Sequence, residues 1–501
     1  MVEDNRNSYR SIAKAIGLFG GVKVFEVLIN IVRSKIMAIF LGTSGMGVYG
    51  LITSTMGFVS SLTGFGLHTS GVRDVSKSVS SGNQAKVNYT VSVLRVLVLG
   101  TGLLGFAFLF FFSNRISIWS FGSSDYSWCF KTVAISLFVD QIVIGHTVLM
   151  QGTFHYKYLA KSTLIGLVVG LIVTIPLYYY LRVKGIAFVI VIASVTRLLL
   201  TSYYSHKIEF ERVKLSPPEL IRDGGAMLKL GFAIALSGGV TQGSHYLLRS
   251  YISNYGNLSD VGLYTAGIAI ATSYIGVVLT AMGTDYSPRL ASVSDDRVLF
   301  SKTINNQIEI LITLLVPLIA LFIVFIREVV IILYTSDFLP ISGMIEWIML
   351  GMFFRALSFC LSYAIVAKAE SRVFFINELV TNVYSLVFSI IGYRIASFLG
   401  MGIAYTITYL LYSLQVTIVC RKRFAFEMEK HVLVFILISL ICVVSVLITT
   451  KICGGSTWRY VFGVVETAVL SFIAIKRLDR MVGIKVLIGG LFRKKKCDDK
   501  E

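Results

Sequence analysis

Polar and charged residues occur at helical spacing inside stretches of this chain that are otherwise apolar. One helix face carries four of them, at intervals of three, four and three residues: Lys23, Glu26, Asn30 and Arg33. A charge at the centre of a membrane span costs about 2.5 to 3.5 kcal/mol on insertion scales, so it usually faces a cavity or a partner. We therefore expect this face to line a hydrated cavity in which cations bind an anion.

A second helix repeats this arrangement later in the chain. Its polar face advances four residues at a time through Ser237, Thr241, His245 and Arg249, with Gln242 beside it. Two helices with such faces predict a central cavity of cationic character, with apolar walls toward the lipid. His245 is open to another interpretation, because a single histidine on a polar face is commonly a hydrogen-bonded structural residue.

Other charged residues in the predicted spans complete the set. The cations predicted to hold an anionic substrate, with the polar residues beside them, are Lys23, Asn30, Arg33, Arg197, Thr241, Gln242, Arg249 and Arg355. The candidates for coupling transport to an ion are Glu26, Asp140, His245 and Glu378. The structural alternative for each cation is an ion pair or a side chain that reaches the membrane surface, and Lys23 with Glu26 would then simply neutralise each other.

The sequence around the first of these arginines recurs around a later one. Val32-Arg33-Ser34-Lys35-Ile36 precedes Gly47-Val48-Tyr49, and Leu248-Arg249-Ser250-Tyr251-Ile252 precedes Gly262-Leu263-Tyr264 with one residue less in between. The chain therefore contains an internal duplication. In membrane proteins, duplication is typical of transporters built from two related halves, with the substrate between them.

The composition places these helices in a membrane. Of the 501 residues, 55% are hydrophobic and 15% are charged, and mean hydropathy is +0.78, which excludes an ordinary soluble protein. Apolar stretches of about 20 residues, the length that crosses ~30 Å of hydrocarbon, occur fourteen times between Ser11 and Ile475. We expect an all-α polytopic membrane protein with about fourteen transmembrane helices.

A polar segment around Pro217-Pro218 divides the first six spans from the next six. The predicted parts are an N-terminal lobe over residues 1–207, a cytoplasmic linker over 208–225, a C-terminal lobe over 226–425, two further helices within 426–478 and a basic cytoplasmic tail over 479–501. Because each lobe has an even number of crossings, both lobes enter the membrane in the same orientation. A parallel pseudo-two-fold axis should then relate them.

The basic residues predict the orientation of the chain. The formal net charge is +19. Segments that would face the cytoplasm hold roughly five times as many Lys and Arg as the outer ones, as the positive-inside rule requires. Both termini should therefore lie in the cytoplasm, with the chain in the cytoplasmic (inner) membrane of a bacterium. The charge reflects this topology and does not indicate nucleic-acid binding.

The sequence shows no motif of an enzyme or of a nucleotide-driven transporter. Residues 45–50 match G-x-G-x-x-G, but they connect two membrane helices and lack the βαβ context of a dinucleotide site. No G-x-x-x-x-G-K-[ST] motif occurs, the outer loops are too short for a catalytic domain, and the six cysteines show no paired spacing. We predict a transporter rather than an enzyme, without a cofactor or a metal site.

Several short motifs are similar to those of a known family. They are Leu41-Gly42-Thr43-Ser44-Gly45-Met46-Gly47-Val48-Tyr49, Gly64-Phe65-Gly66-Leu67 with Arg73, Val261-Gly262-Leu263-Tyr264, and Tyr286-Ser287-Pro288-Arg289-Leu290. With the polar-faced first helix and the fourteen crossings, the chain resembles the polysaccharide-biosynthesis flippases. These are the O-antigen and capsule repeat-unit translocases of the multidrug/oligosaccharidyl-lipid/polysaccharide exporter superfamily. The resemblance covers essentially the whole chain.

The resemblance implies two six-helix lobes that form a V, and transport by alternating access. The implied substrate is an oligosaccharide repeat unit on polyprenyl pyrophosphate, moved from the cytoplasmic to the outer leaflet for O-antigen (lipopolysaccharide), capsule or exopolysaccharide synthesis. Contact with polysaccharide polymerase machinery is a further expectation. Arg33 and Arg249 suit the pyrophosphate, because they can form charge-assisted hydrogen bonds with it. The alternatives are a peptidoglycan-precursor (lipid II) flippase and a multidrug or cation antiporter of the same superfamily.

Uphill transport would need an ion gradient, because the chain has no nucleotide-binding motif. We expect H+ or Na+ as the coupling ion and a carboxylate in the membrane as its site. Glu26 is the first candidate, since it lies between Lys23 and Arg33 on one helix face. Asp140 and Glu378 are the second candidates.

Overall fold

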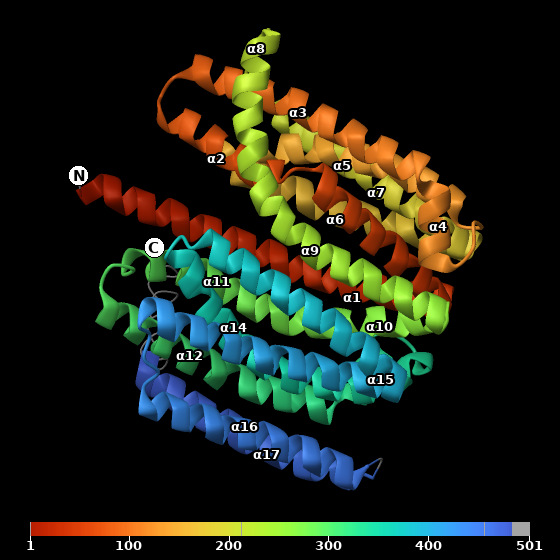
Figure 1. The fold of residues 1–501 in the computed structure, drawn as a ribbon, viewed down its shortest axis with the longest axis vertical. Helices are drawn as coiled ribbons and strands as arrows, with labels where there is room; N and C mark the ends of the chain where they lie inside the picture. The colour runs from red at the N-terminus through yellow and green to blue at the C-terminus, as the bar shows by residue number, and fades with distance from the viewer. Residues whose placement is uncertain (1, 212, 455, 483–501) are drawn as a thin grey trace, which may run out of the picture. The chain divides into compact units, whose positions relative to one another are not determined.

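The computed structural model describes residues 2–211, 213–454 and 456–482, and these residues form helices without a strand among them (Figure 1). Eight helical regions of this part of the chain are long and apolar enough to cross a membrane. They contain ten of the fourteen predicted spans, because the regions Tyr156–Ser205 and Ser371–Phe424 each hold two. The prediction of an all-α polytopic membrane protein is confirmed. The basic tail lies outside the described residues from position 483 onward.

The four remaining predicted spans are also helical. They fall within α1 (Val2–Thr63), which holds the first and most of the second, within α9 (Gly225–Tyr255) and within α17 (Trp458–Val482). Gly42 interrupts the helical dihedral angles of α1 with φ 65° and ψ −167°, so α1 is two helices joined at a kink. The kink falls at the predicted outer connection between the first two spans.

The chain divides into two compact units. Unit 1 contains Met1–Ala266 and Ile332–Phe338, and unit 2 contains Gly267–Ile331 and the chain from Leu339 onward. This division differs from the predicted lobes, whose boundary is the linker 208–225. The difference arises because α9 and most of α10 (Leu258–Ile270) pack on helices of the first half of the chain. The lobes themselves stay a prediction.

Unit 1 is a helical bundle with two apolar cores. After α1 come α2 (Leu67–Ser80), α3 (Gln84–Phe111), α4 (Ser113–Phe121), α5 (Ser127–Gly152), α6 (Tyr156–Leu181), a 3-10 turn (Arg182–Lys184), α7 (Gly185–Ser205) and a short α8 (Pro217–Glu219). One core surrounds Ile52, Phe130 and Tyr178, and the other surrounds Leu94 and Val148. The helices α3, α5 and α7 contribute to these cores and give the polar residues of unit 1 a rigid support.

The predicted linker is held against α3. The backbone N–H of Val213 donates to Ser92 Oγ at 3.1 Å, and the hydroxyl of Tyr89 donates to Asp223 Oδ2 at 2.7 Å. Asp223 lies in a π-helical turn (Leu220–Gly224) that leads directly into α9. Hydrogen bonds from Arg222 and from Tyr89 lower the pKa of the Asp223 carboxyl, so the carboxylate is ionised at neutral pH. The start of α9 is therefore tied to the first half of the chain.

Unit 2 is a second set of long helices. They are a π-helical turn (Ala271–Ile275), α11 (Gly276–Ser292), α12 (Arg297–Val324), α13 (Ile326–Leu333, which crosses the unit boundary), a 3-10 turn (Ser336–Ile341), α14 (Ser342–Ala367), α15 (Ser371–Phe424), α16 (Lys430–Cys453) and α17. The helix α15 breaks at Ala396 and Ser397, and its two halves return close to each other. A Cβ atom on Gly400 would lie 1.9 Å from the carbonyl oxygen of Gly392, so only glycine permits this approach.

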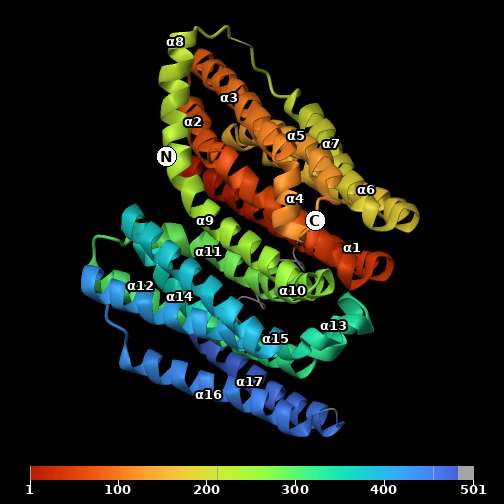
Figure 2. The same cartoon turned by 45° about the vertical axis from the view of Figure 1, so that its right-hand side comes forward.

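The last two helices run side by side along unit 2 (Figures 1 and 2). Near one end of α17, Arg459 is 5% exposed and donates to Glu346 of α14 at 3.1 Å. Near its other end, Arg477 Nε donates to Glu309 of α12 at 2.9 Å. Each buried carboxylate thus has a cationic partner, and α17 is fastened to the unit at both ends.

Candidate functional site

The kink in α1 places the first arginine of the duplicated motif over the tyrosine of the same motif. The guanidinium carbon of Arg33 lies 6.0 Å from the ring centroid of Tyr49, which follows Gly42 in the second half of α1. This separation suits a cation–π contact. The chain must turn at Gly42 for the two side chains to meet, so the short motif after Arg33 has a structural role.

The second copy of the motif folds in the same way. The guanidinium carbon of Arg249 on α9 lies 5.5 Å from the ring centroid of Tyr264 on α10. Arg249 Nε donates to Thr265 Oγ1 and Nη1 donates to the carbonyl oxygen of His245, both at 3.3 Å. The duplication in sequence is therefore a duplication of one arginine–tyrosine pair, and both pairs belong to unit 1.

The first pair has unused hydrogen-bonding capacity. Tyr178 on α6 is 0% exposed. Its phenol interacts electrostatically with the guanidinium of Arg33, as the phenol of Tyr49 does. Among the described residues, Arg33 Nε is buried and has no hydrogen-bond partner. A buried polar group without a partner costs about 1 to 3 kcal/mol. A ligand that accepts from Arg33 would remove part of this cost.

The partners of the arginines divide them into two groups. Arg197, Arg459 and Arg477 each pair with a carboxylate, and Arg197 Nη2 lies 2.7 Å from Asp140 Oδ1. In the part of the chain that the structure describes, no carboxylate oxygen lies within 4.0 Å of Arg33, Arg249 or Arg355. A tyrosine ring does not cancel a full positive charge. These three arginines therefore keep a net charge that an anion can use.

The other residues predicted on the first polar face have a different environment. Lys23 Nζ lies 2.9 Å from Glu26 Oε2, with half of the lysine side chain exposed. This geometry corresponds to mutual neutralisation, the structural alternative for these two residues. Asn30 is exposed on the same helix.

The second polar face lies along α9, which packs on the second half of α1. Thr241 Oγ1 donates to the carbonyl oxygen of Ser237 at 3.3 Å. The side-chain amide of Gln242 contacts Gly57 so closely that a Cβ atom there would lie 2.3 Å from it. His245 is exposed. Gln242 thus helps to pack two helices, while His245 remains accessible.

The two copies of the motif also touch each other through their glycines. A Cβ atom on Gly47 would lie 1.9 Å from the carbonyl oxygen of Leu258, and one on Gly262 would lie 1.8 Å from the carbonyl oxygen of Thr43. Each acceptor stands four residues before the other glycine, so the contact is reciprocal. Ser259 Oγ donates to Thr43 Oγ1 at 2.7 Å beside it. Only glycine fits at either position without displacing the backbone.

Arg355 in unit 2 is also placed against tyrosines. Arg355 Nη1 donates to the Tyr405 hydroxyl at 3.1 Å, and its guanidinium carbon lies 5.3 Å from the ring centroid of Tyr409. The predicted coupling residue Glu378 belongs to the same unit and accepts a hydrogen bond from Tyr412 at 2.8 Å. Unit 2 thus has its own arginine–tyrosine contact, on helices α14 and α15.

The three candidate coupling carboxylates differ in what compensates their charge. Glu26 pairs with Lys23, and Asp140 pairs with Arg197. Glu378 has a neutral donor, Tyr412, and no cation within ion-pair distance among the described residues. A carboxylate without a cationic partner inside a membrane is the one whose charge is most costly. This geometry favours Glu378 over Glu26 as the residue that binds a proton or a cation.

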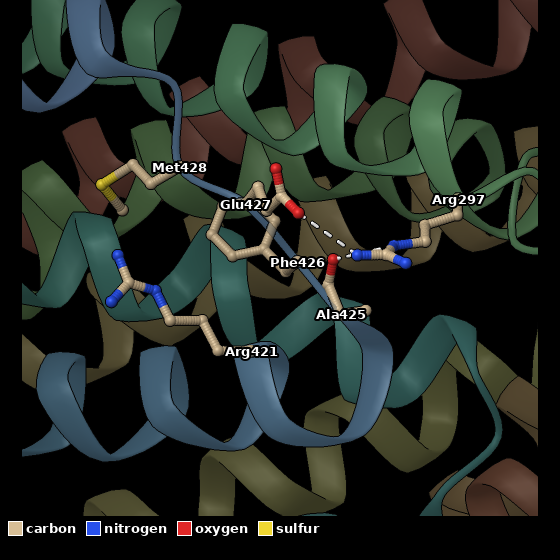
Figure 3. Close-up of a pocket in the computed structure, with 6 residues that line it drawn as sticks. All are labelled: Arg297, Arg421, Ala425, Phe426, Glu427 and Met428. Atoms are coloured by element: carbon tan, nitrogen blue, oxygen red, sulfur yellow. Dashed lines mark hydrogen bonds and ion pairs between the residues drawn. The ribbon is translucent and has the colours of Figure 1, made fainter.

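A hollow of about 400 Å³ opens elsewhere on unit 2, at the end of α15 (Figure 3). Arg297 reaches across it to the carbonyl oxygen of Ala425 at 3.1 Å and to Glu427 at 3.2 Å. The hollow is lined by Arg297, Arg421, Ala425, Phe426, Glu427 and Met428, none of which the sequence predicted as functional. Across the described chain, no three His, Cys, Asp or Glu side chains come together as metal ligands.

Sequence reasoning missed the tyrosines. Tyr49 and Tyr264 occupy equivalent positions in the two copies of the repeat. This equivalence could have indicated that each tyrosine pairs with the arginine of its own copy. Tyr405, Tyr409 and Tyr412 have the spacing of one helix face, which could have marked them. Nothing in the sequence near Arg33 indicates Tyr178, because the fold brings it from a distant helix.

The structure is similar to those of known membrane transporters. It superimposes on the lipid II flippase MurJ in an inward closed conformation with a TM-score of 0.70 and 12% identity, over 93% of this chain and 98% of that one. It superimposes on an inward-facing MATE family multidrug resistance transporter of the MOP superfamily with a TM-score of 0.65 and 14% identity, over 80% and 94%. For a MOP superfamily transporter from Pyrococcus furiosus the TM-score is 0.58 and the identity 15%, over 82% and 96%. This likeness shows the fold.

Comparison of sequences identifies the family. The search of curated proteins returned no match. A family model described as polysaccharide biosynthesis protein matches residues 36–343, more than half of the chain, and confirms the resemblance drawn from the motifs. The matched residues include both copies of the duplicated glycine–tyrosine motif and Arg249, whereas Arg33 lies just before them. The chain therefore belongs to the polysaccharide biosynthesis protein family, and its fold is that of the MOP superfamily.

Proposed function

We propose that the protein is a flippase for oligosaccharide repeat units linked to polyprenyl pyrophosphate. It would move them from the cytoplasmic to the outer leaflet of a bacterial cytoplasmic membrane, for the synthesis of O-antigen, capsule or exopolysaccharide. The family and the fold support a transporter in polysaccharide biosynthesis. The observation that carries the proposal is that, among the described residues, no carboxylate lies within ion-pair distance of Arg33 or Arg249 in the predicted membrane helices of unit 1.

The chemistry of the substrate matches these arginines. A pyrophosphate carries several negative charges on oxygens that accept hydrogen bonds, and a guanidinium binds such a group with two parallel bonds. Arg33 has a buried Nε without a partner in the described chain. Arg249 directs two of its nitrogens to uncharged acceptors, which a phosphate oxygen can replace. Both residues would hold the headgroup during transport.

Two alternatives act on other substrates. A multidrug antiporter for cations would be expected to have carboxylates at its centre, whereas both copies of the motif in unit 1 present an arginine whose described hydrogen-bond acceptors are uncharged. A lipid II flippase moves a substrate with the same pyrophosphate, and one similar structure carries that name. The family description, which names polysaccharide biosynthesis, favours the repeat-unit substrate over lipid II.

We infer that transport is coupled to an ion through Glu378. When ionised, this carboxylate attracts the positive charge of Arg355, although the two groups are farther apart than the 4.0 Å of an ion pair. When Glu378 binds a proton, the positive charge of Arg355 is no longer offset. The affinity of unit 2 for an anion would then depend on the protonation of Glu378. Glu26 is the first candidate from the sequence, but its carboxylate is paired with Lys23 in the structure.

The test is the deletion of the gene in its own host. We expect loss of surface polysaccharide and accumulation of lipid-linked repeat units in the cytoplasmic leaflet, where they are shielded from an external glycosidase. Expression of the wild-type gene should restore both. Normal surface polysaccharide together with an unchanged pool of lipid-linked intermediates would refute the proposed function.

A further inference from the structure

Unit 2 contains a group of aromatic and polar side chains that the proposed role of the arginines does not use. We call it the tyrosine cluster and define it as Arg355, Asn377, Glu378, Tyr384, Tyr405, Tyr409, Tyr412 and Gln415. Three of its tyrosines follow each other in the second half of α15 at positions i, i+4 and i+7. The ring centroids of Tyr405 and Tyr409 lie 4.7 Å apart, and those of Tyr409 and Tyr412 lie 6.4 Å apart.

The cluster lies on the inner face of its helix. On the opposite face of α15, at the same spacing, stand exposed apolar side chains: Ile407, Leu411, Leu414 and Ile418. That face has the composition of a surface in contact with lipid. The tyrosine face therefore points away from lipid. Tyr405 and Tyr409 nevertheless remain partly exposed.

Polar groups of three kinds border the rings. Glu378 accepts from Tyr412 at 2.8 Å, and Asn377 Oδ1 accepts from Gln415 Nε2 at 2.6 Å. Arg355 donates to Tyr405 through one nitrogen and has no carboxylate within 4.0 Å in the described part of the chain. A carboxylate, an amide pair and a guanidinium thus surround flat phenol rings, and each has lone pairs or N–H groups left for another partner.

This combination has the chemistry that recognises a carbohydrate. One face of a pyranose ring is lined by C–H groups and stacks on an aromatic ring, while its hydroxyl groups both donate and accept hydrogen bonds. Carboxylate, amide and guanidinium groups bind such hydroxyls in pairs. An inorganic anion would not need four phenols, and a metal ion would need more carboxylates than one. We propose that the tyrosine cluster binds the saccharide of the transported lipid. This inference rests on the proposed function.

The experiment compares two ligands that share a headgroup. The first is the lipid-linked saccharide extracted from cells that lack the transporter, and the second is farnesyl pyrophosphate, which carries no sugar. Their binding to the purified full-length protein in detergent is measured for the wild type and for Tyr409→Leu, Tyr409→Phe and Tyr274→Leu. Tyr274 is the control, because it is a tyrosine of unit 2 that packs against Phe322 outside the cluster.

We expect Tyr409→Leu to weaken binding of the saccharide lipid by about tenfold, which corresponds to about 1.4 kcal/mol, and to leave farnesyl pyrophosphate binding unchanged. Tyr409→Phe should bind both ligands nearly as the wild type does, since the stacking ring remains. Tyr274→Leu should also match the wild type. Equal loss of both ligands in Tyr409→Leu, or loss of neither, would overturn the saccharide site.

The same assay separates this inference from the proposed function. Arg33→Ala and Arg249→Ala should weaken the binding of both ligands, because each ligand carries a pyrophosphate. If these variants bind farnesyl pyrophosphate as the wild type does, the headgroup assignment fails, whatever the result for Tyr409. If the arginine variants behave as expected and Tyr409→Leu does not discriminate between the ligands, only the saccharide site fails.

Discussion

Arg33 and Arg249 occupy positions that a membrane helix rarely gives to a charged residue without compensation. Each would cost about 2.5 to 3.5 kcal/mol at the centre of a span, and the tyrosine beside it returns only about 0.5 to 2 kcal/mol through a cation–π contact. Arg459 and Arg477 show how the same chain treats structural arginines, since each pairs with a buried glutamate. The contrast supports the proposal that the two motif arginines bind a ligand.

At the residue scale, Arg33→Ala and Arg249→Ala should each abolish surface polysaccharide at normal membrane abundance of the protein. Lysine at either position should restore part of it, because the charge remains while the paired hydrogen bonds of a guanidinium are lost. Polysaccharide is measured by extraction and immunoblotting of whole cells. Arg115→Ala, an exposed arginine of α4, is the control and should have no effect. Wild-type polysaccharide in both alanine variants would contradict the assignment.

The coupling residue can be identified by a pair of isosteric substitutions. In proteoliposomes with an imposed proton or sodium gradient, Glu378→Gln should remove the response of transport to the gradient, because glutamine neither binds a proton nor carries a charge. Glu26→Gln should retain the response, since Glu26 only neutralises Lys23. The opposite result would return the coupling role to Glu26, and a response retained in both variants would exclude both residues.

The sequence located the two charged positions of the repeat but not the residues that surround them. The positions of Arg33 and Arg249 follow from helical spacing and from the repeat. Their tyrosine partners depend on the kink at Gly42 and on the approach of α10, which local sequence does not encode. The coupling role of Glu26 stays a prediction, and its distance of 2.9 Å from Lys23 agrees with the alternative in which the two residues neutralise each other.

At the scale of elements, the contact between the two glycine motifs joins α1 to α10. It brings backbone against backbone at Gly47 and Gly262. By the predicted topology it lies at the outer side of the membrane, where an alternating-access transporter has to close while its cavity faces inward. The hydrogen bond between Ser259 and Thr43 marks the closed contact.

Gly47→Ala and Gly262→Ala should each hold this contact open, since the new methyl group would meet a carbonyl oxygen at 1.9 or 1.8 Å. Forced packing of this kind costs about 1 to 3 kcal/mol. In a variant without native cysteines, Thr43→Cys and Ser259→Cys should form a disulfide readily, and either alanine should slow its formation severalfold. The control is Gly170→Ala, whose added Cβ meets nothing within 4 Å. Unchanged cross-linking in the glycine variants would exclude the contact as a closure.

The helices themselves were largely predictable, because length and hydropathy suffice to locate a membrane span. Ten of the fourteen predicted spans lie in the apolar helices of the structure. The packing of α9 was not predictable. Its Gly239 and Gly243 fit against Leu62 and Phe58 of α1, and its Gln242 lies against Gly57. Such a fit depends on the shapes of two surfaces rather than on the hydropathy of either.

At the scale of the whole molecule, the distribution of Lys and Arg predicts which loops face the cytoplasm. Reporter fusions at Gly82, Pro217 and Arg423 should report a cytoplasmic location, and fusions at Gly122, Asn257 and Gly454 an external one. All six positions lie at or near ends of helices in the structure. The reverse pattern would also reverse the direction in which the contact of Gly47 and Gly262 closes.

The central claim is that this protein moves lipid-linked saccharide across a membrane by holding its pyrophosphate with Arg33 and Arg249. The most direct measurement is translocation in proteoliposomes that contain the purified protein and the lipid-linked saccharide extracted from its host, with an external glycosidase that cleaves only exposed substrate. Wild-type protein should expose the inner-leaflet pool to cleavage within minutes. The variant Arg33→Ala/Arg249→Ala should leave about half of the substrate protected, as in protein-free liposomes. Equal cleavage with wild type and double variant would contradict the role of the arginines, and protection with wild-type protein would contradict the flippase itself.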